Sequence, residues 1–542
     1  MTSRLNFREK LTSYLNASYP LLWITTHEEI RVFNEIADHF AATATEQKRK
    51  PRVIYEWDAV RGLTRLEANQ AKTRSPVDGL VPVKKLLEHI EQSHNDYELY
   101  ILKDFHPFLQ EPMVRRALRN MTMKLKAKSN AIIFVSPVIA IPEELTKEVQ
   151  LLEFSLPDDE GLKNRLLFVQ RAAEKSREGS VRAGNSEAAK HDFSISPEVM
   201  LRAVEAGKGL TDGEAENAYT LALVENKKFN DGFVQSVFGE KVTQVKKNGL
   251  LTYLPPDTTF DEVGGLDGLK TWIRQRGRAY LPEARKYGLP FPRGVLFCGI
   301  PGGGKTLLAK ATSAELKLPL FQLDVGSLFG KLVGETEQNF RKVIQIVDGI
   351  GSCILFVDEI EKALNRSAVS GQGDTGTSSR SFGTLLSWLS DHKTPVFAIG
   401  TSNNFTILPP ELIRKGRFDE LFWLDLPSDA DRIAIFRVLL KRYGREAAKF
   451  DLMKLSKASK GFTGAEIEQV IVSTMFKCFS DKGRDITDND LVAEIKTTVP
   501  QSKTNEQDLQ HMRNEAKGKL RMAGDDGTVS EVSDELRNIA VG

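Results

Sequence analysis

A glycine-rich stretch at residues 299–306 reads GIPGGGKT and fits the spacing G-x-x-x-x-G-K-[ST]. The apolar run RGVLFCG before it predicts a strand, and the run LLAKATSAEL after it has helical spacing. Glycines let backbone N–H groups turn inward around phosphates, and the helix N-terminus adds partial positive charge. The stretch therefore predicts a nucleoside triphosphate site, in which Lys305 reaches the β- and γ-phosphates and Thr306 binds Mg²⁺. We expect the nucleotide to lie against Gly299, Ile300, Pro301, Gly302, Gly303, Gly304, Lys305, Thr306 and Leu307.

Two carboxylates end a second apolar run, CILFVDE, at residues 353–359. Four apolar residues followed by Asp358 and Glu359 are typical of a buried strand that ends in a Walker B motif. The distance from the glycine-rich stretch makes this interpretation specific. We expect Asp358 to hold Mg²⁺ through water, and Glu359 to orient or activate the attacking water.

Further polar residues follow two later strand-like runs. In PVFAIGTSNN, residues 395–404, Asn403 comes at the end of the run and can hold the lytic water. In LPPELIRKGRFDELFWLDLP, residues 408–427, Arg414 and Arg417 precede the next run. Their position predicts arginine fingers, which stabilise charge on the transferring phosphoryl group.

The overall composition is that of a globular protein with 542 residues, enough for two to four domains. Its formal net charge of +2 gives no whole-chain signature of nucleic-acid or anionic-membrane binding. The longest apolar run near the N-terminus, Leu21–Ile24, is too short for a signal peptide, and no run is long enough for a membrane span. The three cysteines are far apart in sequence and suit buried apolar positions. We expect a cytoplasmic protein without a membrane span.

Together these motifs resemble those of the AAA+ family of ring ATPases. FDEVGGLDGLK at 260–270 resembles the family's entry linker, and KGFTGAEIEQV at 460–470 resembles its helical lid. The resemblance implies that Val263 and Gly264 flank the adenine and that Gly464 and Ala465 contact the nucleotide from the lid. A small residue at Ala465, where distant AAA+ clades carry a sensor arginine, places the chain in the core AAA clade.

A closer resemblance is to the conserved hypothetical AAA ATPases of algal plastid and cyanobacterial genomes. It rests on LDVGSLFGKLVGETE, GDTGTSSRSFGTLLSWLSD and IRKGRFDELFWLDLP, and covers most of the chain, with the best motifs in 255–500. One departure is Gly303, where many relatives have threonine. The resemblance implies an α/β, three-layer P-loop NTPase (AAA+) domain with a C-terminal helical lid, ATP and Mg²⁺ as ligands, and assembly with itself into a ring, most simply a hexamer.

The first half reads as a degenerate copy of the second. LLEFSLPDDEGLKNRLLFV at 151–169 echoes LFWLDLPSDADRIAIFRVL at 421–439, and KGLTDGEAENAYTLAL at 208–223 echoes the lid. The runs 97–105 and 130–137 stand where the Walker B and sensor strands belong. Its chemistry is missing, because the loop after Ile24 has no glycines and Asp104 is followed by Phe105. An unrelated α/β adaptor is the alternative interpretation.

We therefore expect five parts: a degenerate AAA-like α/β domain at 1–165, its helical lid at 166–250, an active AAA large α/β subdomain at 251–435, a helical lid at 436–500, and a polar C-terminal tail at 501–542. The basic stretch 114–130 has helical spacing and suits either a solvated amphipathic helix or a nucleic-acid patch.

What the ATP is used for stays open between three hypotheses. The loop at 330–337 resembles a pore loop, but Leu332 stands where many protein-unfolding relatives have an aromatic residue. We expect a ring that remodels or disassembles a protein client. The alternatives are a regulatory or scaffold ATPase that binds partners through its N-terminal half, and a nucleic-acid-dependent ATPase, which the near-neutral charge disfavours.

Overall fold

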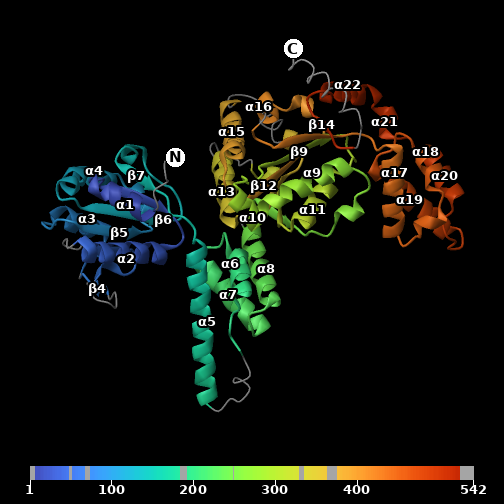
Figure 1. Cartoon of the computed structure of the whole chain (residues 1–542). Helices are drawn as coiled ribbons and strands as arrows, with labels where there is room; N and C mark the ends of the chain where they lie inside the picture. The colour runs from blue at the N-terminus through green and yellow to red at the C-terminus, as the bar shows by residue number, and fades with distance from the viewer. Residues whose placement is uncertain are drawn as a thin grey trace. The chain divides into compact units, whose positions relative to one another are not determined.

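The computed structural model of the chain describes residues 7–47, 52–66, 74–77, 79–183, 192–247, 249–328, 335–362, 375–414 and 416–524 (Figure 1). The chain forms two compact units. The first comprises Met1–Val204 and Leu210–Phe229, and the second comprises Glu205–Gly209 and Asn230–Gly542. Each unit contains its own seven-stranded sheet.

The sheet of the first unit has the strand order β4-β3-β2-β5-β6-β1-β7. Its strands are β1 (Leu21–Thr25), β2 (Val53–Asp58), β3 (Gly62–Leu66), β4 (Arg74–Pro76), β5 (Glu98–Lys103), β6 (Ala131–Ser136) and β7 (Val149–Leu152). Five of them run parallel, while β3 and β4 extend one edge as antiparallel strands. Four helices cover the two faces: α1 (Phe7–Asn16) and α2 (Glu29–Gln47) on one, and α3 (Val83–Gln92) and α4 (Pro112–Ala127) on the other.

Continuous apolar runs form the central strands because both faces of this sheet are covered. Successive side chains of a strand point to opposite faces. Trp23 and Phe134 accordingly pack with α3 and α4, whereas Leu22 and Ile133 pack with α1 and α2. The unit is thus a three-layer α/β structure.

A set of helices follows this sheet: α5 (Asp159–Arg182), α6 (Pro197–Gly207), α7 (Asp212–Asn226) and α8 (Asp231–Lys247). Thr211 and Glu214 form a capping box at the start of α7, in which each side chain accepts the other's backbone N–H. Arg165 of α5 pairs with Asp212 and, at 2.7 Å, with Glu216, and so holds α5 against α7.

The sheet of the second unit has the strand order β14-β13-β9-β12-β11-β10-β8. Its strands are β8 (Leu251–Leu254), β9 (Gly294–Gly299), β10 (Leu320–Leu323), β11 (Cys353–Val357), β12 (Val396–Ser402), β13 (Glu420–Leu424) and β14 (Arg521–Met522). All pair in parallel except β8, which is antiparallel to β10. Shorter helices connect them: α10 (Pro282–Tyr287), α12 (Val325–Leu328) and α16 (Pro410–Ile413).

This sheet also lies between two helical layers (Figure 1). Helices α9 (Asp267–Gly277) and α11 (Lys305–Leu316) cover one face, packing on Phe297, Ile354 and Ile399. Helices α13 (Glu335–Ile350) and α15 (Thr375–Asp391) cover the other, packing on Cys298 and Leu355. The loop from β9 to α11 is the glycine-rich stretch.

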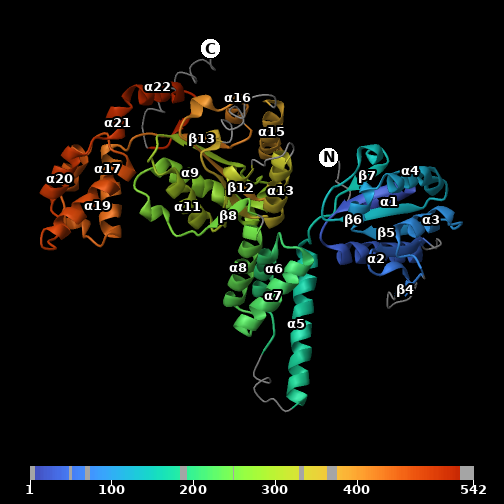
Figure 2. The same cartoon turned by 180° about the vertical axis from the view of Figure 1, so that it is seen from behind.

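A helical lid follows the sheet and has a core of its own, formed by α17 (Asp429–Arg442), α18 (Leu452–Ala458), α19 (Gly464–Ser480) and α20 (Asp488–Thr497). After it, α21 (Gln501–Thr504) and α22 (Glu506–Ala516) run back toward the sheet (Figure 2). There β14 adds to the edge strand β13, and Arg513 of α22 donates to Asp425 at 2.7 Å. The described part of the segment that we expected as a polar tail therefore completes the sheet.

The two sheets share the same order of five strands. The order is β7-β1-β6-β5-β2 in the first unit and β13-β9-β12-β11-β10 in the second. In both sheets the strand of these five that comes first in the sequence, β1 or β9, lies between the strands that come fourth, β6 or β12, and fifth, β7 or β13. This confirms the prediction that an AAA-like α/β domain precedes the active one. An unrelated α/β adaptor domain would not be expected to repeat the strand order of the second sheet.

The expected boundaries at 165 and 435 lie within α5 and α17, so the structure places the start of each helical part a few residues earlier, at Asp159 and Asp429. Within the described ranges, we find no helix whose length and apolar content would let it cross a bilayer.

Candidate active site

The glycine-rich loop joins β9 to α11, and its shape depends on glycine at several positions. Gly302 and Gly304 have φ values of +76° and +82°, a region that other residues rarely adopt. At Gly299 a Cβ atom would lie 2.2 Å from the carbonyl oxygen of Leu424. Gly303 differs, because its φ is not in that region and a Cβ would meet the Ile300 carbonyl oxygen at 3.2 Å. Thr306 is exposed at the start of α11.

Lys305, the first residue of α11, is buried and points back into this loop. Its Nζ donates to the carbonyl oxygens of Gly299 at 2.9 Å and Ile300 at 2.8 Å. Burial lowers the pKa of Lys305 to about 8, although the charges of Glu361 and Asp358 act in the opposite direction. The ammonium group thus lies between the loop and the acidic end of β11, where a phosphate chain would give it stronger acceptors.

Asp358 and Glu359 follow β11 directly, and a threonine of the neighbouring strand holds both. The Thr401 hydroxyl donates to Asp358 Oδ1 at 2.5 Å and accepts the backbone N–H of Glu359 at 2.8 Å. Glu359 has a φ of +49°, which turns the chain out of the strand. The sequence analysis missed Thr401, whose only signal was a polar residue two positions before Asn403 at the end of a buried strand.

Asn403 lies beside two carboxylates, the expected Glu359 and the unexpected Glu361. Its Nδ2 donates to Glu359 Oε1 at 2.9 Å, and its backbone N–H donates to Glu361 Oε1 at 3.0 Å. Glu359 also pairs with Lys362. The other oxygen of Glu361, Oε2, is buried and has no hydrogen-bond partner among the described residues. Glu361, a buried carboxylate that acts on the Lys305 charge, is a second residue that the sequence analysis missed.

The two expected arginine fingers differ in their surroundings. Arg414 is exposed at the end of α16, and no hydrogen bond or ion pair of its guanidinium occurs among the described residues. Arg417 is half-buried, and its Nε donates to Ser390 Oγ at 3.3 Å. Within the same ranges, neither side chain hydrogen-bonds to the glycine-rich loop or to Asp358 and Glu359. The structure therefore does not bring these arginines into this chain's own site.

The entry linker and the lid do meet around the glycine-rich loop. Gly264 lies so close to α17 that a Cβ would be 2.6 Å from the backbone nitrogen of Ile435. Val263 is buried, and its carbonyl oxygen accepts Lys270 Nζ at 2.6 Å. At the start of α19, beside Gly464, the Ala465 N–H points to the Gly302 carbonyl oxygen at 3.4 Å. The remaining expected residues are Ile300, which is buried, Pro301, which is exposed, and Leu307, which packs against the core.

ATP and Mg²⁺ fit this set of groups. The loop glycines leave backbone N–H groups accessible, and Lys305 supplies positive charge. Thr306 and Asp358 supply hydroxyl and carboxylate oxygens, the ligands that Mg²⁺ prefers, and would hold the ion, which neutralises phosphate charge when bound. No cluster of three His, Cys, Asp or Glu side chains suited to a metal occurs among the described residues. A Mg²⁺ held largely by phosphate and water needs none.

Leu332 and the rest of 330–334 in the expected pore loop, and 366–374 of the second loop, lie outside the described residues. The last residues of the two loops, 335–337 and 375–380, form the first turns of α13 and α15.

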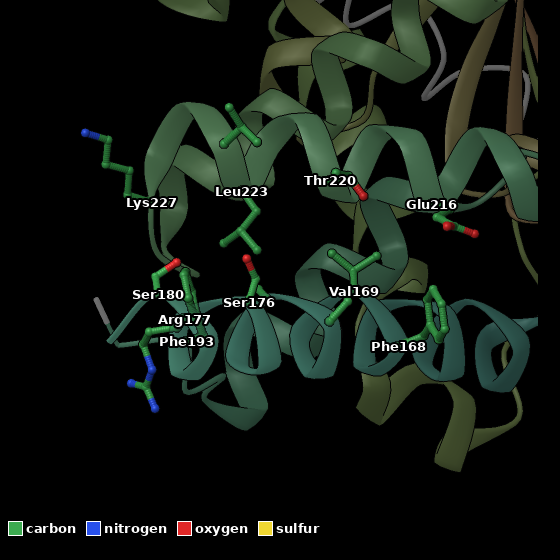
Figure 3. Close-up of a pocket in the computed structure, with 13 residues that line it drawn as sticks. Phe168, Val169, Ser176, Arg177, Ser180, Phe193, Glu216, Thr220, Leu223 and Lys227 are labelled. Carbon is green, nitrogen blue, oxygen red and sulfur yellow. The ribbon is translucent and has the colours of Figure 1, made fainter. Parts of the chain in front are cut away.

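A groove with a volume of about 480 Å³ lies between α5 and α7 of the first unit (Figure 3). Val169 and Leu223 form part of its apolar lining, and Phe168 beside them is 52% exposed. Figure 3 shows Arg177 and Lys227 at one end and Glu216 toward the other. The sequence analysis did not predict this groove, because it depends on how the two helices pack.

Three parts of the chain match known families. Residues 7–154 match the family described as SpoVK-like AAA ATPase, N-terminal domain, and residues 177–248 match SpoVK-like AAA ATPase, second domain. Residues 295–426, which include the glycine-rich loop and both acidic residues after β11, match the ATPase family associated with various cellular activities (AAA).

Whole proteins are similar over nearly their full length. The uncharacterized AAA domain-containing protein ycf46 of Guillardia theta is 34% identical over 522 residues, which is 96% of this chain and 97% of that protein. The proteins of the same description from Trieres chinensis and Pyropia yezoensis are each 34% identical, over 522 and 512 residues. The repeated sheet order, the glycine-rich loop and these similarities agree, and the chain therefore belongs to the AAA ATPase family, among the ycf46 AAA proteins, and is an ATPase.

Proposed function

We propose that the chain assembles into an ATP-hydrolysing ring, most simply a hexamer, that remodels or disassembles a protein partner. The observation that carries this proposal is the contact between the lid and the glycine-rich loop. The Ala465 N–H points to the Gly302 carbonyl oxygen, and Gly264 of the entry linker packs on α17. A change in the phosphates at this loop would act directly on the position of the lid, and a lid that moves with each hydrolysis can do work on a partner.

The hydrolysis itself would use groups whose placement the structure gives. Lys305 and Thr306 would hold the phosphate chain and its Mg²⁺ together with Asp358. Glu359 would orient the attacking water, and Asn403, 2.9 Å from Glu359 Oε1, would hold both the carboxylate and the water in position. The side chain of Glu359 has Asn403 and Lys362 as partners, so its orientation is set before ATP binds.

The exposed position of Arg414 supports the proposed ring. An exposed guanidinium that lies outside its own site can stabilise transferring phosphate only on a neighbouring chain. Arg417, whose Nε donates to Ser390 Oγ, would either keep Arg414 in position or act as a second arginine finger.

Mixed rings test this assignment. The Arg414→Ala chain keeps an intact glycine-rich loop but lacks the finger, and the Lys305→Ala chain lacks the lysine but keeps the finger. Each alone should hydrolyse ATP at no more than about a hundredth of the normal rate. A mixture should recover activity, because one chain's arginine then faces the other chain's loop. Activity of Arg414→Ala alone at the normal rate, or no recovery on mixing, would contradict the assignment.

Remodelling is tested by the steady-state ATPase rate with an unfolded polypeptide, single-stranded DNA or RNA added, using Glu359→Gln as the blank. We expect stimulation by polypeptide alone. Stimulation by nucleic acid alone would contradict a protein client. The structure disfavours that outcome, because α4 packs one face, with Leu118 and Met121, against the sheet. On its other faces Lys124 pairs with Glu91 at 2.8 Å and Arg115 with Glu144 at 3.5 Å.

A second function is favoured by the groove between α5 and α7, namely a regulatory ring that holds partners through its first unit (Figure 3). Its apolar lining and the charge at one end suit an apolar peptide with an acidic residue facing Lys227. A photo-crosslinking amino acid at Phe168 should then capture one peptide of this composition. The same substitution at Met113, which is 81% exposed on α4, is the matched control. Capture of the same peptides at both positions would exclude a specific groove partner.

We also propose a cytoplasmic location. All three cysteines are buried and form no disulfide, and burial raises the pKa of Cys353 to about 12. Such thiols stay protonated at neutral pH and suit a reducing compartment. Cell fractionation with antibodies checks this, and recovery in a membrane fraction washed at high salt would contradict it.

A further inference from the structure

The first unit repeats the strand order of the nucleotide-binding unit, and the register of its central strands shows which residues occupy equivalent positions. The last pair between the two central parallel strands is Thr25 with Ser136 in the first unit and Cys298 with Ser402 in the second. Helix α2 begins four residues after Thr25, whereas α11 begins seven residues after Cys298. The loop of the first unit is thus three residues shorter, too short to enclose a phosphate with its backbone.

A carboxylate lies at the end of this short loop. Glu28 is buried immediately before α2, and its Oε1 accepts the backbone N–H of Asp212 at 2.6 Å. Its other oxygen pairs with Arg31, which also donates to the Ser155 carbonyl oxygen at 2.5 Å and lies 4.3 Å from the ring centre of Phe154. Burial raises the pKa of Glu28, while the bond from Asp212 and the charge of Arg31 lower it.

The partner of Glu28 is the helix that corresponds to lid helix α19. Asp212 is the first residue of α7, and the capping box of Thr211 and Glu214 has its counterpart in Thr463 and Glu466 at the start of α19. The carboxylate of the residue that precedes α2 therefore lies at the N-terminus of α7. Unpaired N–H groups and the helix dipole favour an anion at such a place.

The first of the two acidic positions after the Walker B strand is also replaced. Asp104 and Glu359 both leave their strands with a left-handed φ, +45° and +49°, which makes Lys103 the counterpart of Asp358. The sequence analysis had taken Asp104 for that position. Lys103 pairs with Glu56 and lies 3.6 Å from Glu29. A lysine cannot bind Mg²⁺, and Lys103 instead offers a cation to Glu29 at the start of α2 and to Glu56 of β2.

We propose that the first unit binds no nucleotide and that Glu28 takes the place of a phosphate group, linking the short loop after β1 to the start of α7. Helix α7 is then held to the first sheet in one arrangement. This inference does not depend on what the ATPase acts on.

Nucleotide stoichiometry tests the first part. Fluorescent ATP should bind the full-length chain at one site per chain, and the Lys305→Ala chain should bind none. Two sites per chain, or a saturable site that survives in Lys305→Ala, would overturn the proposal.

Hydrogen exchange of the full-length chain tests the second part. In Glu28→Ala the amides at the start of α7 should exchange at least about tenfold faster, because their anion is lost. Glu29→Ala is the matched control, since Glu29 pairs with Lys103 and has no described bond to α7. Glu28→Gln, which keeps an acceptor oxygen but loses the charge, should give a smaller increase and serves if Glu28→Ala does not fold. Unchanged exchange in both Glu28 variants, or an equal increase in Glu29→Ala, would overturn the proposal.

Inorganic phosphate provides a third test of the proposal. Millimolar phosphate should slow the α7 exchange of Glu28→Ala again, and leave the unsubstituted chain unaffected. Equal slowing by sodium chloride at the same ionic strength would show a general salt effect, and would overturn the role of Glu28 as an internal anion.

Discussion

Lys305 makes nucleotide affinity depend on pH. Burial lowers its pKa to about 8, and contact with phosphates would raise that pKa. Below pH 8 the side chain is already charged, so affinity should be constant. Above pH 8 binding must take up a proton, and affinity should fall by up to about tenfold per pH unit. Calorimetric titration at pH 7, 8 and 9, in buffers with different ionisation heats, checks both the affinity and the proton uptake. A flat affinity without proton uptake would contradict the assigned pKa.

Thr401 should matter for turnover more than for binding. Thr401→Val removes the hydroxyl that holds Asp358 and the backbone of Glu359, and leaves that buried N–H without its acceptor. A loss of about 1–3 kcal/mol in the transition state predicts a kcat lowered by roughly 5- to 150-fold. Thr401→Ser keeps the hydroxyl and is the control. The measurement is kcat, together with the Kd for ATP determined in a Glu359→Gln background. An equal loss of kcat in Thr401→Val and Thr401→Ser would contradict a role for the hydroxyl.

The glycines of the loop should not be equivalent. Gly302 has a φ of +76°, so Gly302→Ala should cost about 1–2 kcal/mol and lower Tm by about 2–6 °C. At Gly303 the backbone accepts other residues, and Gly303→Thr should change the ATPase rate by no more than about threefold. Differential scanning fluorimetry and the ATPase assay check this pair. A loss at Gly303 as large as at Gly302 would mean that the loop changes shape on binding.

The spacing of motifs allowed the sequence to predict the positions of Lys305, Asp358 and Asn403. Thr401 and Glu361 could not be found in this way, because their importance comes from a neighbouring strand and from a buried charge. The same limit explains the placement of Asp104, since the sequence shows an acidic residue after a strand but does not show where the chain turns.

At the scale of elements, the end of the described chain should be needed for the second sheet. β14 pairs with β13, and Arg513 of α22 binds Asp425. A chain that ends after Pro500 would expose the edge of β13, and should unfold at a lower temperature and aggregate more readily. A chain that ends after Gly524 keeps these contacts and is the matched control. Equal Tm values for the two chains would contradict a structural role for this segment.

The parallel strands were predictable because each is a continuous apolar run buried on both faces. β14 was not, since two residues, Arg521 and Met522, carry no periodicity. Its formation depends on the edge of β13 and on α22, which brings the chain back from the lid. The helices α5 and α17 began earlier than expected for a related reason: Asp158 and Ser428 cap them, and these caps lie before the apolar spacing becomes visible.

At the scale of the whole molecule, an arginine that acts on a neighbour makes activity depend on concentration. Hydrolysis per chain should fall on dilution into the nanomolar range, as rings dissociate. ATP should oppose the dissociation of Glu359→Gln rings, which light scattering measures. A constant rate per chain from micromolar to nanomolar concentration would show that each chain is complete by itself, and that Arg414 is a surface residue.

The repeated strand order also has a consequence for the time at which each part is made. The first sheet needs only residues up to β7, which ends at Leu152, whereas the glycine-rich loop follows β9, which begins at Gly294. At about 5–20 residues per second, a ribosome takes roughly 7–28 seconds to cover that interval. The first sheet can therefore be complete before the glycine-rich loop has been synthesised. Each ATP site should form only after the first sheet of the same chain has folded.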